Sequence, residues 1–225
     1  MSELNPENLC ADLLENNVYK KDALNYMMKM QYDLQKFVAD KRGNIAPDSK
    51  VSLFDFAKET IYYWGCVTAE YAELQERDWC DALEEKEATG LVNEDLLETQ
   101  FEYIDMYHFL MNFFIFSKIT EFDLTLEDLF DRTPSFDNVD PKLIELQWSY
   151  VSILAGEFID ILPYKHWKTY DNDMQLDQDA LMQKAIHMLY AFILMGKSLG
   201  IDKERFYDLY ISKNKENYNR QNNNY

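Results

Sequence analysis

Apolar side chains recur along most of the chain at intervals of three and four residues, which is the spacing of one face of an α-helix. Capping residues such as Ser52 and Asn93 begin these stretches, and Gly43 and Gly200 end two of them. The chain has only 6 Gly and 5 Pro in 225 residues, fewer than the turns of a many-stranded protein require. The pattern therefore predicts an all-α helical bundle. After a short helix from Asn5-Pro6, we expect helices over about 22–43, 52–90 and 93–119, a short one from 125, and further helices over 141–163, from 177 or 179 to 200, and from 202 onward.

A weak internal repeat links the two halves of the chain. The segment WGCVTAEYAEL, which starts at Trp64, aligns with WSYVSILAGEF, which starts at Trp148, at an offset of 84 residues (148 − 64). Farther along, His108 aligns with Ala191 at an offset of 83 (191 − 108). Each half then forms a helical hairpin, and two hairpins make a pseudo-symmetric four-helix core, although unrelated amphipathic helices can align equally well. We expect a single domain over residues 1–225, with an active half, a degenerate half and a phosphate-binding tail at about 52–130, 141–212 and 213–225.

Four carboxylates stand out because their surroundings are apolar. The stretch IYYWGCVTAEYAEL has no charges except Glu70 and Glu73, and the stretch FEYIDMYHFLMNFFIF has none except Glu102 and Asp105. A helix that is apolar on nearly every side is buried, and a buried carboxylate must be protonated, paired or bound to a metal. Neither stretch contains a Lys or Arg. The pattern favours a site for Mg²⁺ or Mn²⁺, which prefer oxygen ligands, over acids that reach a wet groove or distant basic residues.

The second half of the chain does not repeat this set of acids. Glu157 aligns with Glu73, but Leu154 aligns with Glu70. The helix ALMQKAIHMLYAFILMG contains no acid and carries Lys184. We therefore expect one site per chain, with the second half as scaffold and substrate wall.

Charge and composition narrow the possible partners. The formal net charge is −19, from 41 acidic and 22 basic residues, so the surface repels nucleic acids and anionic lipids. The three cysteines form no CxxC pair, which fits a reducing compartment. The N-terminus MSELNPENLC lacks the features of a signal peptide, and the longest apolar stretch is too short to span a bilayer. We expect a cytoplasmic protein that binds neither nucleic acid nor membrane.

Three segments, taken in order, resemble a known family. They are AEYAEL at 69–74, FEYIDMYHF at 101–109 and YISKNKENYNRQNNNY at 210–225. This combination resembles the dimeric dUTPases, all-α relatives of the MazG pyrophosphatases that occur in bacteria, their phages and trypanosomatids. The resemblance covers about residues 22–225, including the degenerate second half.

The resemblance implies a magnesium-dependent homodimer that cuts dUTP, and possibly also dUDP, with a metal-activated water. Cleavage between the α- and β-phosphates releases dUMP and pyrophosphate. The implied metal ligands are Glu70, Glu73, Glu102 and Asp105, with Glu70 and Glu73 as catalytic residues and Glu70 as the base. The implied phosphate ligands are Lys213, Asn217, Arg220 and Asn223. The implied base and sugar contacts are Gln31, Gln35 and Trp79.

The chain departs from the family at two positions. Residue 35 is Gln where the dUTPases have Asn, and related phage dCTPases also carry Gln there. Because both amides can donate and accept, side-chain type does not separate uracil from cytosine. The duplicated layout favours dUTP, and dCTP or another deoxynucleotide is the alternative. The second departure is the ending NNNY in place of NNGY. Asn can take the place of this Gly because it adopts the left-handed backbone conformation readily.

Two other classes of function stay open from the sequence. A di-iron carboxylate bundle also uses paired acids on four helices, but it needs two Glu-x-x-His motifs, and Asp105-x-x-His108 comes nearest. We expect His108 to be a core or supporting residue rather than a ligand. The other class is a non-catalytic phage protein that keeps the fold and binds a host partner.

Overall fold

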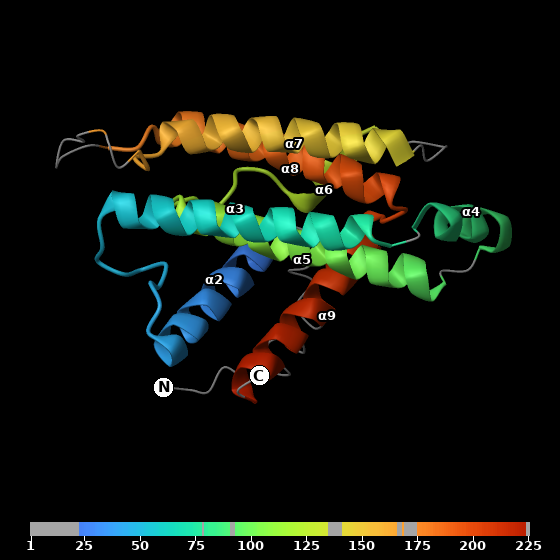
Figure 1. Cartoon of the computed structure of the whole chain (residues 1–225), viewed down its shortest axis with the longest axis horizontal. Helices are drawn as coiled ribbons and strands as arrows, with labels where there is room; N and C mark the ends of the chain where they lie inside the picture. Colours follow the sequence, from blue (N-terminus) through green and yellow to red (C-terminus); the bar gives the residue numbers. More distant parts are fainter. Residues whose placement is uncertain are drawn as a thin grey trace.

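The computed structural model describes residues 23–77, 79–90, 93–134, 141–165, 168 and 175–223. These residues form eight α-helices and no strand, which confirms the all-α prediction (Figure 1). The short helix expected from Asn5-Pro6 lies outside them. The helices are α2 (Ala23–Arg42), α3 (Leu53–Gln75), α4 (Trp79–Thr89), α5 (Glu94–Phe116), α6 (Leu126–Arg132), α7 (Pro141–Ile161), α8 (Gln178–Ser198) and α9 (Lys203–Asn222).

Helix α5 is the centre of the bundle. It packs along α3 and also contacts α2, α4, α8 and α9, while α7 packs along α8. In Figure 1 the pair α7 and α8 forms one layer, α3 and α5 form the next, and α2 and α9 extend away beneath α5. From Tyr103 to Phe116, every side chain of α5 is buried except Asp105 and Phe109, which are half-buried. The predicted burial of this stretch is confirmed.

The two halves of the repeat meet through aromatic rings. Trp64 of α3 stacks on Trp148 of α7 with ring centroids 5.6 Å apart and an interplanar angle of 11°. Tyr71 stacks on the same Trp148 at 4.1 Å. Trp64 and Trp148 are aligned positions of the repeat. Two positions that the predicted repeat aligns are therefore in contact.

The capping signals locate most helix boundaries. Thr125 and Asp128 form a reciprocal capping box, and the side chains of Ser52 and Asn93 accept hydrogen bonds from the first turns of α3 and α5. The expected helix over 52–90 is wrong in one respect, because it is interrupted between Gln75 and Trp79. No Gly or Pro marks this break. There, Arg77 turns toward α5 and pairs with Glu98 and Glu102.

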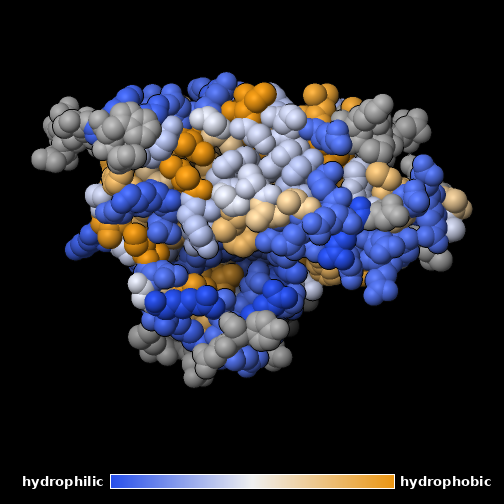
Figure 2. Space-filling view, viewed as in Figure 1, coloured by the Kyte–Doolittle hydropathy of each residue, from blue (hydrophilic) through white to orange (hydrophobic). Residues whose placement is uncertain are grey.

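The outer face of α3 is exposed, so the prediction that its apolar stretch is buried on nearly every side is wrong for a single chain. Tyr62 is 62 % exposed, and Gly65, Ala69 and Ala72 also face solvent. On α7, Leu146, Tyr150 and Ile153 are exposed. Figure 2 shows a pale area at the centre of this face, with orange residues to its left and bluer residues to its right.

No single helix among the described residues is long and apolar enough to cross a bilayer. Helices α8 and α9 meet that criterion only as a pair, across a bend of 100°.

Candidate active site

Three of the four predicted acids come together between α3 and α5. Carboxylate oxygens of Glu70, Glu102 and Asp105 all lie within 4.8 Å of one another, and the three side chains are partly buried. Glu102 and Asp105 are one turn apart on α5, so both face the same neighbouring helix. Three carboxylates at this spacing form a donor set for a hard divalent cation. His108 is not part of the cluster.

The cluster carries more negative charge than its basic neighbours offset. Burial, followed by the charges of Asp105, Glu73 and Glu102, raises the pKa of Glu70 to about 7. Burial also raises the pKa of Asp105, despite the ammonium group beside it. Carboxylates that hold protons this tightly are stabilised when a cation approaches. The donor set therefore fits Mg²⁺ or Mn²⁺.

Two basic side chains reach the cluster from outside the two apolar stretches. Arg77 Nη2 lies 2.7 Å from Glu102 Oε1, and Lys213 Nζ lies 2.8 Å from Asp105 Oδ2. The alternative that the acids pair with basic residues from elsewhere in the sequence is therefore correct for Glu102 and Asp105. No ion pair joins Glu70 to a basic group in the described part of the chain. Glu70 is the carboxylate left for a cation or a proton.

Glu73, the fourth predicted ligand, is not part of the close cluster. Its side chain is exposed on α3, one turn beyond Glu70. Its charge contributes to the raised pKa of Glu70, so it lies near enough to act electrostatically. Three of the predicted acids therefore lie together, and Glu73 lies at the exposed edge of their cluster.

A cleft of about 720 Å³ opens beside the cluster, between α2, α3, α5 and α9. This volume suits a nucleotide-sized ligand. Glu70 and Asp105 contribute to its wall. The other predicted residues that line it are Gln31, Gln35, Asn217 and Arg220.

Two predicted residues lie elsewhere. Trp79 begins α4 and is only 4 % exposed, packed in the hydrophobic core rather than at the cleft. Its expected role as a pocket wall has no geometric support in the single chain. Asn223 caps the end of α9 and is exposed.

Gln31 is the centre of a buried hydrogen-bond network. Its Nε2 donates to Asn112 Oδ1 at 2.9 Å, and its Oε1 lies 2.8 Å from His108 Nδ1. His108 also stacks on Tyr210 of α9 with ring centroids 4.2 Å apart. Burial lowers the pKa of His108 to about 3, so this imidazole is neutral. The network ties α2, α5 and α9 together under the cleft, and His108 has the predicted supporting role.

Gln35 is held by a tyrosine from α3. Tyr63 Oη donates to Gln35 Oε1 at 2.7 Å. The Tyr63 ring stacks on Phe116 at 5.1 Å, which fixes the position of its hydroxyl. Tyr63, Asn112 and Glu59 line the cleft and were not predicted. A signal existed for Asn112, which is the one uncharged amide within the apolar run LMNFFIF. Tyr63 and Glu59 have no distinguishing sequence signal.

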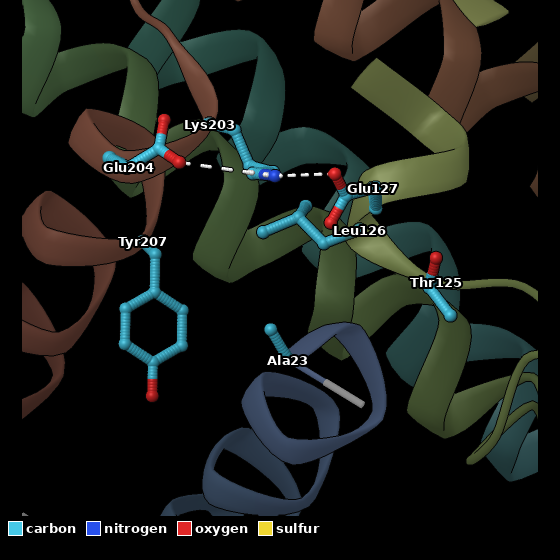
Figure 3. Close-up of a pocket in the computed structure, with 7 residues that line it drawn as sticks. All are labelled: Ala23, Thr125, Leu126, Glu127, Lys203, Glu204 and Tyr207. Carbon is cyan, nitrogen blue, oxygen red and sulfur yellow. Dashed lines mark ion pairs between the residues drawn. The ribbon is translucent and has the colours of Figure 1, made fainter. Parts of the chain in front are cut away.

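A second hollow, of about 300 Å³, lies where α2, α6 and α9 meet (Figure 3). In it Lys203 lies 2.9 Å from Glu127 and 3.9 Å from Glu204. Both of its acids thus face one lysine, and among the described residues it has no cluster of three carboxylates. The cleft beside Glu70 is the better candidate for metal-dependent chemistry.

An all-α bundle with an acidic cluster at a nucleotide-sized cleft is suited to metal-assisted hydrolysis. A family model described as dUTPase matches residues 23–225, and the chain therefore belongs to the dimeric, all-α dUTPase family. It is a nucleoside triphosphate pyrophosphatase, and its general activity is dUTP hydrolysis. Neither a curated protein nor a solved structure matches the chain.

Proposed function

We propose that the protein hydrolyses dUTP, and also dUDP, in a reaction that depends on Mg²⁺ or Mn²⁺ and yields dUMP. From dUTP the second product is pyrophosphate. The observation that carries the proposal is the cluster of Glu70, Glu102 and Asp105, of which Glu70 and Asp105 line the cleft. A divalent cation held there supplies charge neutralisation at the phosphate and a lower pKa for the attacking water. Glu73, one turn beyond Glu70, supports the cation from the rim.

Glu70 is our candidate for the general base. A base works best when its pKa lies near the operating pH, and burial and neighbouring acids raise the pKa of Glu70 to about 7. Asp105 and Glu102 already accept hydrogen bonds from Lys213 and Arg77. Glu70 therefore has the carboxylate best able to accept a proton from water.

One face of α9 supplies the groups for the polyphosphate. Lys213, Asn217 and Arg220 are spaced by four and three residues, so they share a helix face. Asn217 and Arg220 line the cleft, and Lys213 reaches the acidic cluster. Arg and Lys donors bind phosphate oxygens through charge-assisted hydrogen bonds. Asn223 extends this series at the end of the helix.

The exposed face of α3 and α7 is the surface through which we propose that two copies form a homodimer. Tyr62, Leu146, Tyr150 and Ile153 are exposed there, and no charged side chain lies between them on the outer turns of α7 from 146 to 153. Because each chain carries a net charge of −19, an uncharged face is where two copies meet with the least repulsion. Ile153→Asp should convert the dimer to a monomer in light scattering coupled to gel filtration. A dimer that survives this change contradicts the assignment of this face.

A turnover screen tests the activity. The protein is incubated with Mg²⁺ and dUTP, dCTP, dTTP or the corresponding ribonucleotides, and release of pyrophosphate and of orthophosphate is measured separately. We expect pyrophosphate from dUTP at the highest kcat/KM. Preferred cleavage of dCTP would select the alternative substrate, and orthophosphate as the first product would contradict cleavage after the α-phosphate.

A further inference from the structure

Two side-chain amides in the cleft are held by neighbours that fix which atom each presents. They belong to Gln35 of α2 and Asn112 of α5, and both residues line the cleft. Tyr63, which contacts Gln35, precedes Glu70 by seven residues on α3, or about 10 Å along the helix axis. This separation leaves room for a sugar between the acidic cluster and a base at the two amides.

The oxygen of the Gln35 amide is already occupied. Tyr63 donates its hydroxyl proton to Gln35 Oε1 at 2.7 Å. Burial raises the pKa of Tyr63, so the hydroxyl keeps its proton and stays a donor. The Tyr63 ring is held between Phe109 and Phe116, with centroids at 6.4 Å and 5.1 Å. The Gln35 Nε2 group makes no hydrogen bond to any described residue, so it is available to a ligand.

The oxygen of the Asn112 amide is occupied as well. Gln31 Nε2 donates to Asn112 Oδ1 at 2.9 Å. The orientation of the Gln31 amide is set by Asn214 Nδ2, which donates to Gln31 Oε1 at 3.4 Å, and His108 Nδ1 lies 2.8 Å from the same oxygen. Both atoms of the Gln31 amide are thus occupied by neighbours, so its role is to orient Asn112 rather than to meet the ligand. The Asn112 Nδ2 group bonds to none of the described residues and is the second available donor.

A fixed donor that faces the 4-position of the base distinguishes the two pyrimidines. Uracil presents carbonyl oxygens at its 2- and 4-positions, which both accept hydrogen bonds. Cytosine accepts at O2 and N3 but has an N–H₂ donor at the 4-position. A donor that faces this amino group has no acceptor, and a buried polar group without a partner disfavours binding.

From this geometry we propose that Tyr63 and Gln31 are the specificity-determining positioning residues of the cleft. They hold the amides of Gln35 and Asn112 with their N–H₂ groups toward the base, and this selects uracil over cytosine. Side-chain type at position 35 does not set the preference, because the same Gln could present its oxygen if Tyr63 did not occupy it. The inference rests on the proposed function, since it assumes that the cleft binds a pyrimidine nucleotide.

The test compares selectivity between variants rather than activity alone. For the wild type, Tyr63→Phe and Gln35→Glu, kcat/KM is measured for dUTP and dCTP with Mg²⁺. Affinities for dUMP and dCMP are measured by calorimetry without metal. Tyr63→Phe frees the Gln35 amide to turn over, and the preference for uracil should fall about tenfold. Gln35→Glu replaces the donor with an acceptor, which should shift the preference toward cytosine.

Tyr32→Phe is the matched control, because Tyr32 is a partly buried tyrosine of α2 that lies outside the cleft. It should keep the wild-type ratio of dUMP to dCMP affinity. If the wild type hydrolyses dUTP but both variants keep its selectivity, the inference is wrong and the proposed function stands. If no nucleotide is hydrolysed but dUMP binds better than dCMP and Tyr63→Phe removes the difference, the inference stands and the proposed catalysis fails. Equal wild-type affinity for dUMP and dCMP overturns the inference.

Discussion

The α3–α5 hairpin and the α7–α8 hairpin have similar layouts, but they differ in the polarity of matching residues on α5 and α8. In the α3–α5 hairpin, α5 carries Asp105, His108 and Asn112, which line the cleft. At the offset of 83, the positions of α8 that correspond to them hold Met188, Ala191 and Met195, all buried in the core. One hairpin thus keeps polar groups where its counterpart has apolar ones. Because apolar side chains pack there without need of partners, the helix layout alone does not require the polar residues of α5, and a ligand at the cleft best explains them.

The hairpins also differ in how they balance charge. On the α7–α8 side, Lys184 of α8 pairs with Glu157 of α7 at an exposed position. On the α3–α5 side, Glu70 has no basic partner among the described residues, although Lys213 and Arg77 bind its two neighbours. In the α7–α8 hairpin a lysine thus neutralises the acid, whereas we assign a divalent cation to the acids of the α3–α5 hairpin. Two hairpins can therefore pack in this way without an unpaired carboxylate, so the packing does not explain why Glu70 has no basic partner among the described residues.

Removal of the candidate base should have the largest effect. Glu70→Gln should lower kcat for dUTP by roughly 10²–10⁴-fold, because the amide cannot accept the proton of the attacking water. Glu157→Gln is the control from the other hairpin, and its kcat should match that of the wild type. Steady-state kinetics, with circular dichroism to verify the fold, provides the measurement. Similar kcat values for the two variants would remove the functional distinction between the hairpins.

The buried histidine should make folding of the active hairpin sensitive to acid. The folded-state pKa of His108 is lowered to about 3, below the usual 6.5, so only the unfolded chain gains a proton here between these values. The contribution of His108 to stability is fully present above about pH 6.5 and is lost as the pH falls toward 3, by roughly 2–4 kcal/mol. His108→Asn should therefore lose less stability than the wild type between pH 7 and pH 4 in urea unfolding.

His187→Asn is the control for that experiment, because His187 is exposed on α8. It should follow the pH dependence of the wild type. Identical pH dependence of all three proteins would show that His108 is not held neutral in the folded state.

Lys213 should compete with the divalent cation for Asp105. The pair is mostly buried, with Nζ 2.8 Å from Oδ2, so the ammonium must yield when the cation binds. Lys213→Met should raise the affinity for Mn²⁺ in the absence of nucleotide, roughly fivefold or about 1 kcal/mol. The same variant should weaken binding of dUTP. Unchanged or weaker Mn²⁺ binding would mean that Lys213 supports the ion site instead of occupying it.

Replacement of the lysine in the α7–α8 hairpin should have the smallest effect on stability and metal binding. Lys184 and Glu157 form an exposed pair, and such pairs contribute at most about 1 kcal/mol to stability. Lys184→Met should shift the free energy of unfolding by no more than about 0.5 kcal/mol and leave Mn²⁺ binding unchanged. A change in metal binding would indicate that the degenerate hairpin takes part in the site.

The fold was largely predictable because its signals are local. Caps such as Ser52 and Asn93 and the spacing of apolar residues depend on neighbours within a few positions. The break at Arg77 was not predictable, because a contact with α5 rather than a Gly or Pro stabilises it. The exposure of α3 was missed for another reason. An apolar helix face looks the same in sequence whether its own chain or a second copy covers it.

The candidate site was predictable only in part. The acids of α3 and α5 stand out because charge is rare in those stretches, and three of the four do come together. The pairing of Lys213 with Asp105 joins positions more than a hundred residues apart, and no local pattern predicts it. The same holds for Tyr63, whose hydroxyl meets Gln35 only because α2 crosses α3 and α5 at that point.

Mn²⁺ binding measured by calorimetry is the most direct test of the ion site that α3 and α5 form together. We predict that the wild type and Glu157→Gln bind Mn²⁺ at one site in each chain. Glu70→Gln and Asp105→Asn should each weaken this binding at least about tenfold. If Glu70→Gln and Asp105→Asn bind Mn²⁺ as the wild type does, the carboxylates of α3 and α5 do not hold the ion, and the proposed chemistry is wrong.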